Sequence, residues 1–215
     1  MSGAQCNIVI LGVSCFDGMA SSMRVRNLIN PLIEKNFVMA NNLIYQKDNK
    51  EPIGKTGTKN NIRFKVIGFS LKNIFSIFPF FYGGLAFIKS CKAKKQKNIL
   101  YNYNYPDIKN IVFILYARMI GYKVIFDIIE DNNYQGHTGL INKFRLRTSV
   151  FLFRFSRHFT DAMLGISKHL FLLIKIKFKE KVPAYLVPIT VNLAYFNTTQ
   201  TEISNNKNLK IFYGG

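Results

Sequence analysis

Three acidic side chains lie together in the middle of the sequence, where they could bind a sugar or move a proton. Asp127 belongs to the apolar run Lys123–Ile129, and Glu130 and Asp131 follow that run directly. The chain has only 11 acidic residues, so three at one position are notable. At the carboxyl end of a strand, carboxylates can accept hydrogen bonds from sugar hydroxyls or act as a general base. The alternative is that they cap or solvate a loop.

A loop of small residues near the amino terminus is the second candidate for ligand binding. It follows Asn7–Val13, a run typical of a parallel strand buried on both faces. Gly12 and Gly18 lie near its ends, and ligands of open α/β sheets bind at such strand–helix junctions. Ser21 and Arg24 can add polar and charge-assisted contacts. The spacing matches neither G-x-G-x-x-G nor a Walker A sequence, so a plain tight turn is an equal alternative.

Apolar runs typical of strands alternate with amphipathic segments along most of the chain, which predicts a doubly wound parallel α/β sheet. Ser21 or Ser22 can cap the first helix, Asp107 and Ser167 can cap two later ones, and Gly121 can end one. The polar stretch 47–61 is predicted as a loop. The predicted strands are Asn7–Val13, Phe37–Tyr45, Ile62–Phe69, Ile99–Tyr103, Lys123–Ile129, Ala162–Ile166 and Ala184–Pro188, and the predicted helices are Met23–Lys35, Phe80–Lys95, Asp107–Met119, Ile141–Phe159 and Ser167–Phe178.

The charge of the chain is strongly unbalanced. It has 30 Lys and Arg residues against 11 Asp and Glu, a net charge of +19. Such an excess indicates an anionic partner: nucleic acid, an anionic membrane surface or a phosphorylated substrate. The basic segments are Lys89–Lys97 and Lys143–Lys181, and in the second Phe and Leu residues alternate with the charges, which favours a membrane surface. No nucleic-acid-binding motif accompanies the charge, so nucleic acid is not expected as a partner.

Other features set the expected compartment and chemistry. Cys6, Cys15 and Cys91 are odd in number and widely spaced, which predicts reduced thiols, and no His lies near them as a metal site requires. We therefore expect no metal and no cofactor. The apolar run Ile8–Val13 is too short for a secretory signal. Ile74–Ile88 is interrupted by Pro and Gly, which predicts a docked helix rather than a membrane span. The expected location is cytoplasmic, peripheral on the inner face of the cell membrane.

These motifs, in this order, resemble glycosyltransferase family 4 enzymes of the GT-B fold. The first strand, its small-residue loop and the helix with Arg24 resemble the start of that family, where the loop faces the acceptor. Asn192 lies where the family usually has Asp. The other matching segments are Phe126–Asp131, a strand that runs into an acidic loop; Thr160–Leu170, the closest match; Leu186–Asn192 followed by Phe196, a hinge; and Ile211–Gly215, the first strand and Gly turn of the second domain.

The resemblance implies a Rossmann-like fold, one half of a GT-B glycosyltransferase. Residues 1–191 would form the N-terminal, acceptor-side domain, 192–208 an interdomain linker, and 209–215 the first strand of a C-terminal donor-binding domain. The activity implied is retaining transfer of a sugar from a nucleotide sugar to an envelope, surface-polysaccharide or lipid-linked acceptor. The catalytic residues stay unassigned, and this chain without the donor domain is expected to be inactive. The residues expected to contact the acceptor are Gly18, Ser21, Arg24, Glu130 and Asp131.

A non-enzymatic role is the alternative. A basic α/β module could bind an anionic membrane or a partner glycosyltransferase without any catalysis of its own.

Overall fold

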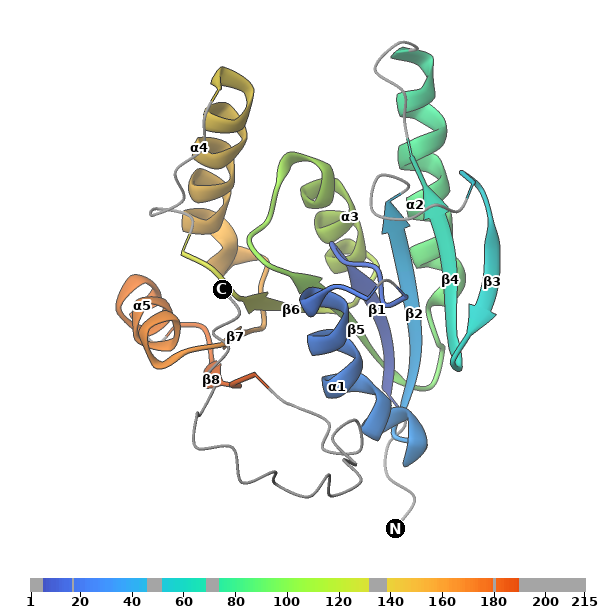
Figure 1. The fold of residues 1–215 in the computed structure, drawn as a ribbon, viewed down its shortest axis with the longest axis horizontal. Helices are drawn as coiled ribbons and strands as arrows, with labels where there is room; N and C mark the ends of the chain where they lie inside the picture. The colour runs from blue at the N-terminus through green and yellow to red at the C-terminus, as the bar shows by residue number, and fades with distance from the viewer. Residues whose placement is uncertain are drawn as a thin grey trace, which may run out of the picture.

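The computed structural model describes residues 6–16, 18–45, 52–68, 74–131, 139–179 and 181–189. Within these residues one eight-stranded sheet has the order β3-β4-β2-β1-β5-β6-β7-β8 (Figure 1). All neighbouring strands pair in parallel except β3, which is antiparallel to β4. The strands are β1 (Cys6–Leu11), β2 (Val38–Tyr45), β3 (Thr56–Lys59), β4 (Ile62–Ile67), β5 (Lys97–Tyr103), β6 (Lys123–Ile128), β7 (Ala162–Gly165) and β8 (Ala184–Leu186).

The strand order defines where a ligand site can form. The chain moves outward from β1 to β2 and β4, then returns to β5 on the other side of β1 and continues to β8. The order therefore reverses between β1 and β5, and open α/β sheets bind ligands outside the carboxyl ends of strands at such a point. We call the edge at which the parallel strands end the carboxyl edge, and the opposite one the amino edge.

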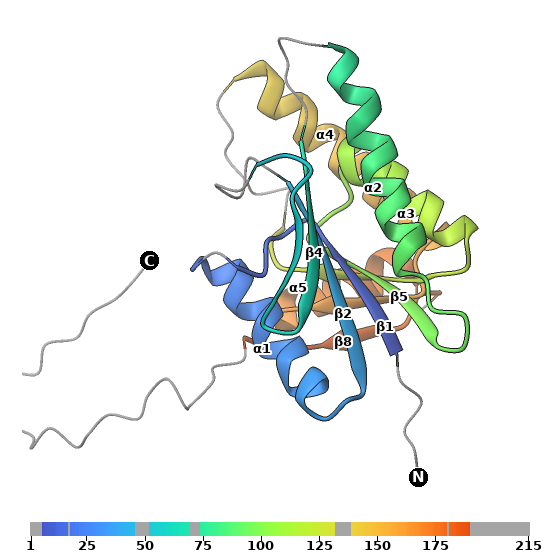
Figure 2. The same cartoon turned by 90° about the vertical axis from the view of Figure 1, so that its right-hand side faces the viewer.

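Helices cover both faces of the sheet (Figure 2). On one face, α1 packs Val25 and Ile29 against alternate residues of β1, such as Ile8 and Ile10. On the other face, α2 to α5 bury a larger core that includes Val9 and the other alternate residues of β1. The helices are α1 (Ala20–Glu34), α2 (Ile77–Cys91), α3 (Ile108–Met119), α4 (Leu140–Phe155) and α5 (Lys168–Phe178), with short 3-10 turns η2 (Ile74–Ser76) and η3 (Ser156–His158).

The predicted fold class is confirmed: this is a Rossmann-like doubly wound sheet. The helix starts predicted at Asp107 and Ser167 and the helix end predicted at Gly121 are also confirmed. The Asp107 side chain accepts a hydrogen bond from the Asn110 amide at the start of α3, and the Ser167 side chain accepts one from the Leu170 amide at the start of α5. Gly121, with φ of 91°, follows the end of α3.

Two predictions about local structure are wrong. The stretch 47–61, predicted as a loop, contains β3, which pairs with β4 through a two-residue turn. Asn60 and Asn61 form that turn with φ of 51° and 60°, the signature of a type I′ hairpin. Neither Ser21 nor Ser22 caps α1. The helix begins at Ala20, and its N-cap is Met19, which makes no side-chain cap bond.

The segment Ile74–Ile88 forms most of η2 and α2, and it packs on the sheet as a docked helix. Phe80 and Phe87 are each 3% exposed in the core. None of the helices within the described part of the chain is long and apolar enough to cross a membrane. The predicted linker 192–208 and strand 209–215 lie outside the described residues.

Candidate functional site

The loop after β1 turns sharply at the carboxyl edge, and Gly12 permits the turn. Its φ is 88°, a backbone conformation that L side chains rarely adopt. A Cβ at this position would lie 2.9 Å from the Tyr103 carbonyl oxygen at the end of β5. Glycine therefore allows the loop to lie directly against β5 at the switch point, the place between β1 and β5 where the strand order reverses.

A buried amide holds the loop in place. Asn42 of β2 accepts a hydrogen bond from the Cys15 amide at 2.9 Å and donates to the Val13 carbonyl, also at 2.9 Å. The Ser22 hydroxyl donates to the Ser14 carbonyl from the first turn of α1. Val13, Ser14 and Cys15 are themselves buried, so this part of the loop is fixed in the interior. The exposed residues of its described part are Gly18 and Met19.

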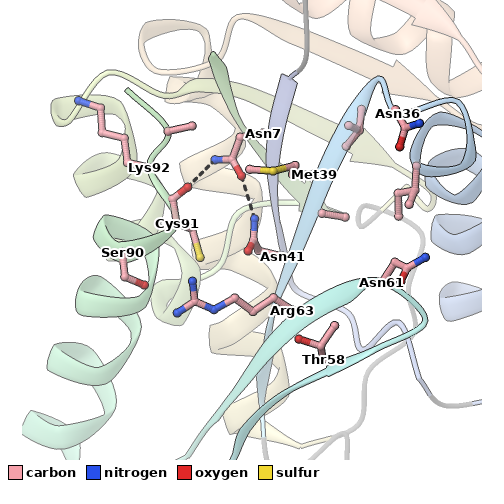
Figure 3. Close-up of a pocket in the computed structure, with 14 residues that line it drawn as sticks. Asn7, Asn36, Met39, Asn41, Thr58, Asn61, Arg63, Ser90, Cys91 and Lys92 are labelled. Atoms are coloured by element: carbon pink, nitrogen blue, oxygen red, sulfur yellow. Dashed lines mark hydrogen bonds between the residues drawn. The ribbon is translucent and has the colours of Figure 1, made fainter. Parts of the chain in front are cut away.

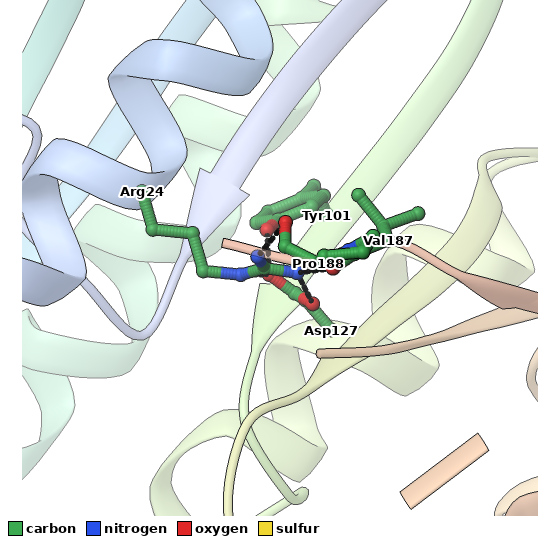
Figure 4. A network of polar contacts seen from close by, with 5 residues as sticks. All are labelled: Arg24, Tyr101, Asp127, Val187 and Pro188. Carbon is green, nitrogen blue, oxygen red and sulfur yellow. Dashed lines mark hydrogen bonds and ion pairs between the residues drawn. The ribbon is translucent and has the colours of Figure 1, made fainter. Parts of the chain in front are cut away.

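An ion pair lies beneath this loop, in the interior (Figure 4). Arg24 of α1 donates from Nε and Nη2 to the two carboxylate oxygens of Asp127, each at 2.8 Å. Tyr101 of β5 donates its hydroxyl to Asp127 Oδ2. Arg24 is 4% exposed and Asp127 is fully buried, so the pair is shielded from water. Two parallel N–H···O bonds are the strongest arrangement that these groups can make.

The same guanidinium also holds the end of β8. Arg24 donates to the carbonyl oxygens of Val187 and Pro188, each at 3.0 Å. Burial lowers the pKa of Arg24, but the hydrogen bond and charge of Asp127 outweigh that effect, so the pKa is raised. Burial and the Asp127 charge raise the pKa of Tyr101 well above its usual value. Arg24 is therefore charged and makes four hydrogen bonds inside the domain, which leaves one N–H for any ligand.

Tyr103 connects two of the residues predicted to contact the acceptor. It is the last residue of β5, half-buried at the switch point. Its pKa is raised to about 12, mainly by burial and further by the charges of Asp127 and Glu130, against the opposing effects of the Arg24 charge and a hydrogen bond with Ser21. The phenol is therefore protonated in all ordinary buffers, and Ser21, Tyr103 and Glu130 lie near one another.

Asp131 lies against a histidine from the next strand–helix unit. Its Oδ2 is 3.7 Å from Nε2 of His169, in the first turn of α5. The Asp131 side chain is 8% exposed and that of His169 is 67% exposed. The carboxylate is therefore largely buried, while the imidazole beside it is open to solvent. Gly165 allows the first turn of α5 to pack against the end of β7, because a Cβ there would lie 2.8 Å from the Phe171 backbone nitrogen.

The structure places the five predicted residues in different settings. Ser21 contacts Tyr103, Glu130 lies near enough for its charge to raise the pKa of Tyr103, Asp131 lies 3.7 Å from His169, and Gly18 lies exposed with open space around it. Arg24 lies inside the domain instead of on its surface. Sequence reasoning missed Tyr103 and His169. Tyr103 could have been found because it ends a predicted strand, and His169 because it follows the Ser167 cap.

Comparison of folds identifies the class to which the domain belongs: a Rossmann-like α/β domain of the kind that forms one half of a GT-B structure. It is similar to a sucrose-phosphate synthase from Thermosynechococcus elongatus, with 12% identity, a TM-score of 0.62, and coverage of 88% of this chain and 49% of that one. It is also similar to Anabaena Alr3699/HepE, solved with UDP and glucose, with 10% identity, a TM-score of 0.53, and coverage of 91% and 47%.

A third similar structure is a UDP-N-acetylglucosamine 2-epimerase from Rickettsia bellii, with 9% identity, a TM-score of 0.51, and coverage of 86% and 45%. The chain thus spans about half the length of each of these proteins. At such identities the likeness concerns the fold. The sequence itself matches no protein-family model and no curated protein.

Proposed function

We propose that this chain forms the acceptor-side half of a retaining GT-B glycosyltransferase similar to family 4. It would act with a donor-binding domain that holds a nucleotide sugar, and transfer the sugar to an envelope, surface-polysaccharide or lipid-linked acceptor. No metal or cofactor takes part in this proposal. The observation that supports it most is the polar cluster at the switch point of a sheet whose fold is similar to half of the sucrose-phosphate synthase.

The residues of the carboxyl edge have the chemistry that an acceptor glycan requires. Glu130 offers oxygens that accept hydrogen bonds from sugar hydroxyls, while Tyr103 and Ser21 can both donate and accept. The exposed Gly18 leaves room for a glycan ring beside the loop. Arg24 acts from below as a positioning residue, because its ion pair with Asp127 fixes α1 relative to β6.

In the proposed enzyme, this domain binds the acceptor and a second domain binds the donor. Transfer requires the donor and the acceptor to be held together, and their orientation supplies much of the rate. In this proposal the 215-residue chain binds the acceptor and has no turnover of its own. The experiment measures transfer of label from radioactive UDP-glucose and other nucleotide sugars to an envelope extract, by this chain and by the longest reading frame that contains it. Multiple turnovers by the chain alone, or no transfer by the longer protein, would contradict the proposal.

Matched variants in the longer protein locate the acceptor site. Glu130→Gln replaces one acceptor oxygen of the carboxylate with a donor and removes its charge, and Ser21→Ala removes a hydroxyl, so each should raise the KM for the acceptor about tenfold with little change in kcat. Glu34→Gln is the control, because Glu34 is an exposed carboxylate at the far end of α1. An equal effect of all three variants would show that the carboxyl edge is not the acceptor site.

We also propose that the domain lies on an anionic membrane surface through α4. Lys143, Arg147 and Arg154 recur at spacings of four and seven residues, so they share one stripe of the helix. Phe144, Phe151 and Phe155 form the adjacent stripe and are 63%, 56% and 49% exposed. A basic stripe beside an exposed aromatic stripe is typical of helices that lie in a lipid interface.

A second exposed aromatic group supports the same surface. Phe75 of η2 and Phe78 and Tyr82 at the start of α2 are 74%, 73% and 77% exposed. Both views show the first turns of α2 and α4 extending past the ends of the strands, on the same side of the molecule (Figures 1 and 2). The basic segment Lys89–Lys97 lies elsewhere, because α2 ends at the amino edge before β5 begins. The proposed membrane surface therefore consists of α4 and the start of α2.

A further inference from the structure

A hollow of about 520 Å³ opens at the amino edge, whereas the candidate acceptor site lies at the carboxyl edge (Figure 3). It lies where β1, β2 and β4 begin and where α2 ends, so it shares no residue with the cluster around Tyr103. Its location makes it independent of the proposed glycosyltransferase activity.

The floor of this hollow is polar, in a part of a parallel sheet that is normally apolar. Asn7 is fully buried, donates to the Cys91 carbonyl at 2.8 Å, and accepts from Asn41 Nδ2 at 2.8 Å. Asn41 is 7% exposed, and its Nδ2 also donates to the Ile8 carbonyl at 3.2 Å. No described residue donates to Asn41 Oδ1. The Asn41 amide oxygen has no donor among the described residues and is open to the hollow, so it is available to accept a hydrogen bond from a ligand.

Cationic side chains line the same hollow. Arg63 of β4 points across it toward Cys91, and its charge lowers the pKa of that thiol against the larger raising effect of burial (Figure 3). The guanidinium lies over the ring of Phe87, 5.7 Å from the ring centroid, and no described carboxylate pairs with it. Lys92 lines the opposite rim, and the lining includes no acidic residue. The hollow therefore combines unpaired positive charge with a fixed hydrogen-bond acceptor.

We propose that this hollow binds a small hydroxylated anion, a phosphate or carboxylate of the size of glycerol phosphate. Arg63 would hold the anionic group, because a guanidinium matches the paired oxygens of phosphate and carboxylate alike; the Lys92 side chain points away from the hollow and would add only its charge at the rim (Figure 3). A hydroxyl of the ligand would donate to Asn41 Oδ1. A bound ligand stabilises the folded state in proportion to its concentration, so this domain would respond to the level of that metabolite.

The experiment is a titration of the 215-residue chain with four probes: glycerol 3-phosphate, glycerate, inorganic phosphate and glycerol. Side-chain amide signals of Asn7 and Asn41 in ¹⁵N NMR spectra report binding at the hollow. Glycerol 3-phosphate or glycerate should shift these signals with a Kd about tenfold below that of inorganic phosphate, because one buried hydrogen bond is added. Glycerol should leave them unchanged. The tighter of the two organic anions names the anionic group.

Charge-matched variants separate a built site from general attraction to a basic protein. Arg63→Gln should weaken binding of the organic anion at least about tenfold, since it removes a charge-assisted contact. Arg145→Gln removes an equal charge from the exposed surface of α4 and should change the Kd less than about twofold, because exposed charges at that distance are screened. Unchanged thermal melting of both variants shows that they fold. Equal weakening by the two variants, or equal affinity for phosphate and glycerol 3-phosphate, would overturn the proposal.

Discussion

Arg24 shows how a residue near a ligand site can act entirely from inside the protein. Its guanidinium is paired with the Asp127 carboxylate, and two backbone carbonyl groups accept hydrogen bonds from two of its other N–H groups. Removing one member of a buried pair leaves the other charged and unpaired, which is far more costly than removing both. This asymmetry makes a direct test of the network possible.

We expect Arg24→Met to lower the free energy of unfolding by about 3 kcal/mol, because Asp127 keeps a buried charge without its partner. Asp127→Leu should have a similar effect. The double variant should cost clearly less than the sum of the two, since no unpaired charge is left. Urea denaturation of the four proteins measures this coupling. Additive losses would mean that the two side chains do not interact in solution.

At the scale of elements, the contact between α2 and α3 depends on a glycine. A Cβ on Gly84 would lie 2.7 Å from Cζ of Phe113, which is fully buried. A Cβ on Gly83, the preceding residue, would lie 3.7 Å from Nζ of the flexible Lys65 side chain and 3.8 Å from Cγ2 of Ile67, both ordinary van der Waals contacts. Both glycines lie inside the same helix, but only the one at position 84 is packed too closely for a Cβ.

Alanine at these two positions should therefore have opposite effects. Gly83→Ala should stabilise the protein by about 0.5–1 kcal/mol, the gain in helix propensity. Gly84→Ala gains the same amount, but overpacking against Phe113 costs about 1–3 kcal/mol, so a net loss is expected. Thermal melts compare the pair directly. A stabilised Gly84→Ala variant would show that α2 and α3 are packed less closely than the structure indicates.

Asp161 joins the starts of β6 and β7 to the end of α3. It accepts hydrogen bonds from Arg118, from the Val124 amide at 2.9 Å and from Lys123 at 3.0 Å. Burial raises the pKa of Asp161, but these three donors outweigh it, so the pKa is lowered. A carboxyl group whose pKa is lower in the folded state stabilises the protein above its unfolded pKa, and this contribution is lost as the pH falls through the folded pKa.

Asp161→Asn should therefore destabilise the protein at pH 7 by about 1 kcal/mol, a value reduced by the partial exposure of the site. The difference between the two proteins should begin to shrink as the pH falls below about 4, where the carboxyl group of the unfolded chain takes up its proton, and shrink further as the pH passes the lower folded-state pKa. Denaturant melts at several pH values provide the measurement. A difference that stays constant down to pH 2 would exclude the carboxylate as its source.

The signals that sequence reasoning used well were local, and those it missed were not. The caps at Asp107 and Ser167 depend on residues three positions apart, so the sequence shows them directly. Arg24 and Asp127 are 103 residues apart, and no sequence pattern near either residue predicts that they form an ion pair. For that reason Arg24 was expected at the ligand surface. Strand β3 is a different case, because its signal, the turn at Asn60 and Asn61, was present and was not used.

For the whole molecule, the net charge of +19 has a consequence that vesicles can test. The 215-residue chain should bind vesicles rich in phosphatidylserine at low salt and bind neutral vesicles poorly. Each basic residue near an anionic surface contributes about 1 kcal/mol, so replacing Lys143, Arg147 and Arg154 with Gln should weaken binding about 100-fold. Replacing Phe144, Phe151 and Phe155 with Ser should reduce the part of the binding that resists high salt, with the aromatic side chains at the start of α2 supplying the remainder.

The control for this experiment changes charges outside the proposed membrane surface. Lys89, Lys94 and Lys97 belong to the basic segment at the amino edge, and their replacement with Gln removes the same total charge. Co-sedimentation of all variants at low and high salt should show a much smaller loss for this set. Equal losses from both sets, or equal binding to neutral and anionic vesicles, would leave the charge as a general property of the surface.

The bonds from Arg24 to the end of β8 also constrain the order in which this protein can fold as it is synthesised. Pro188 lies 164 residues after Arg24, and Asp127 lies 103 residues after it. The helix that carries the guanidinium leaves the ribosome long before either partner exists, and contacts so distant in sequence form slowly. A nascent chain shorter than about 190 residues therefore lacks two of the four hydrogen-bond acceptors of the Arg24 guanidinium, beside an unfinished sheet edge. That is the stage of its synthesis at which a chaperone would protect it most.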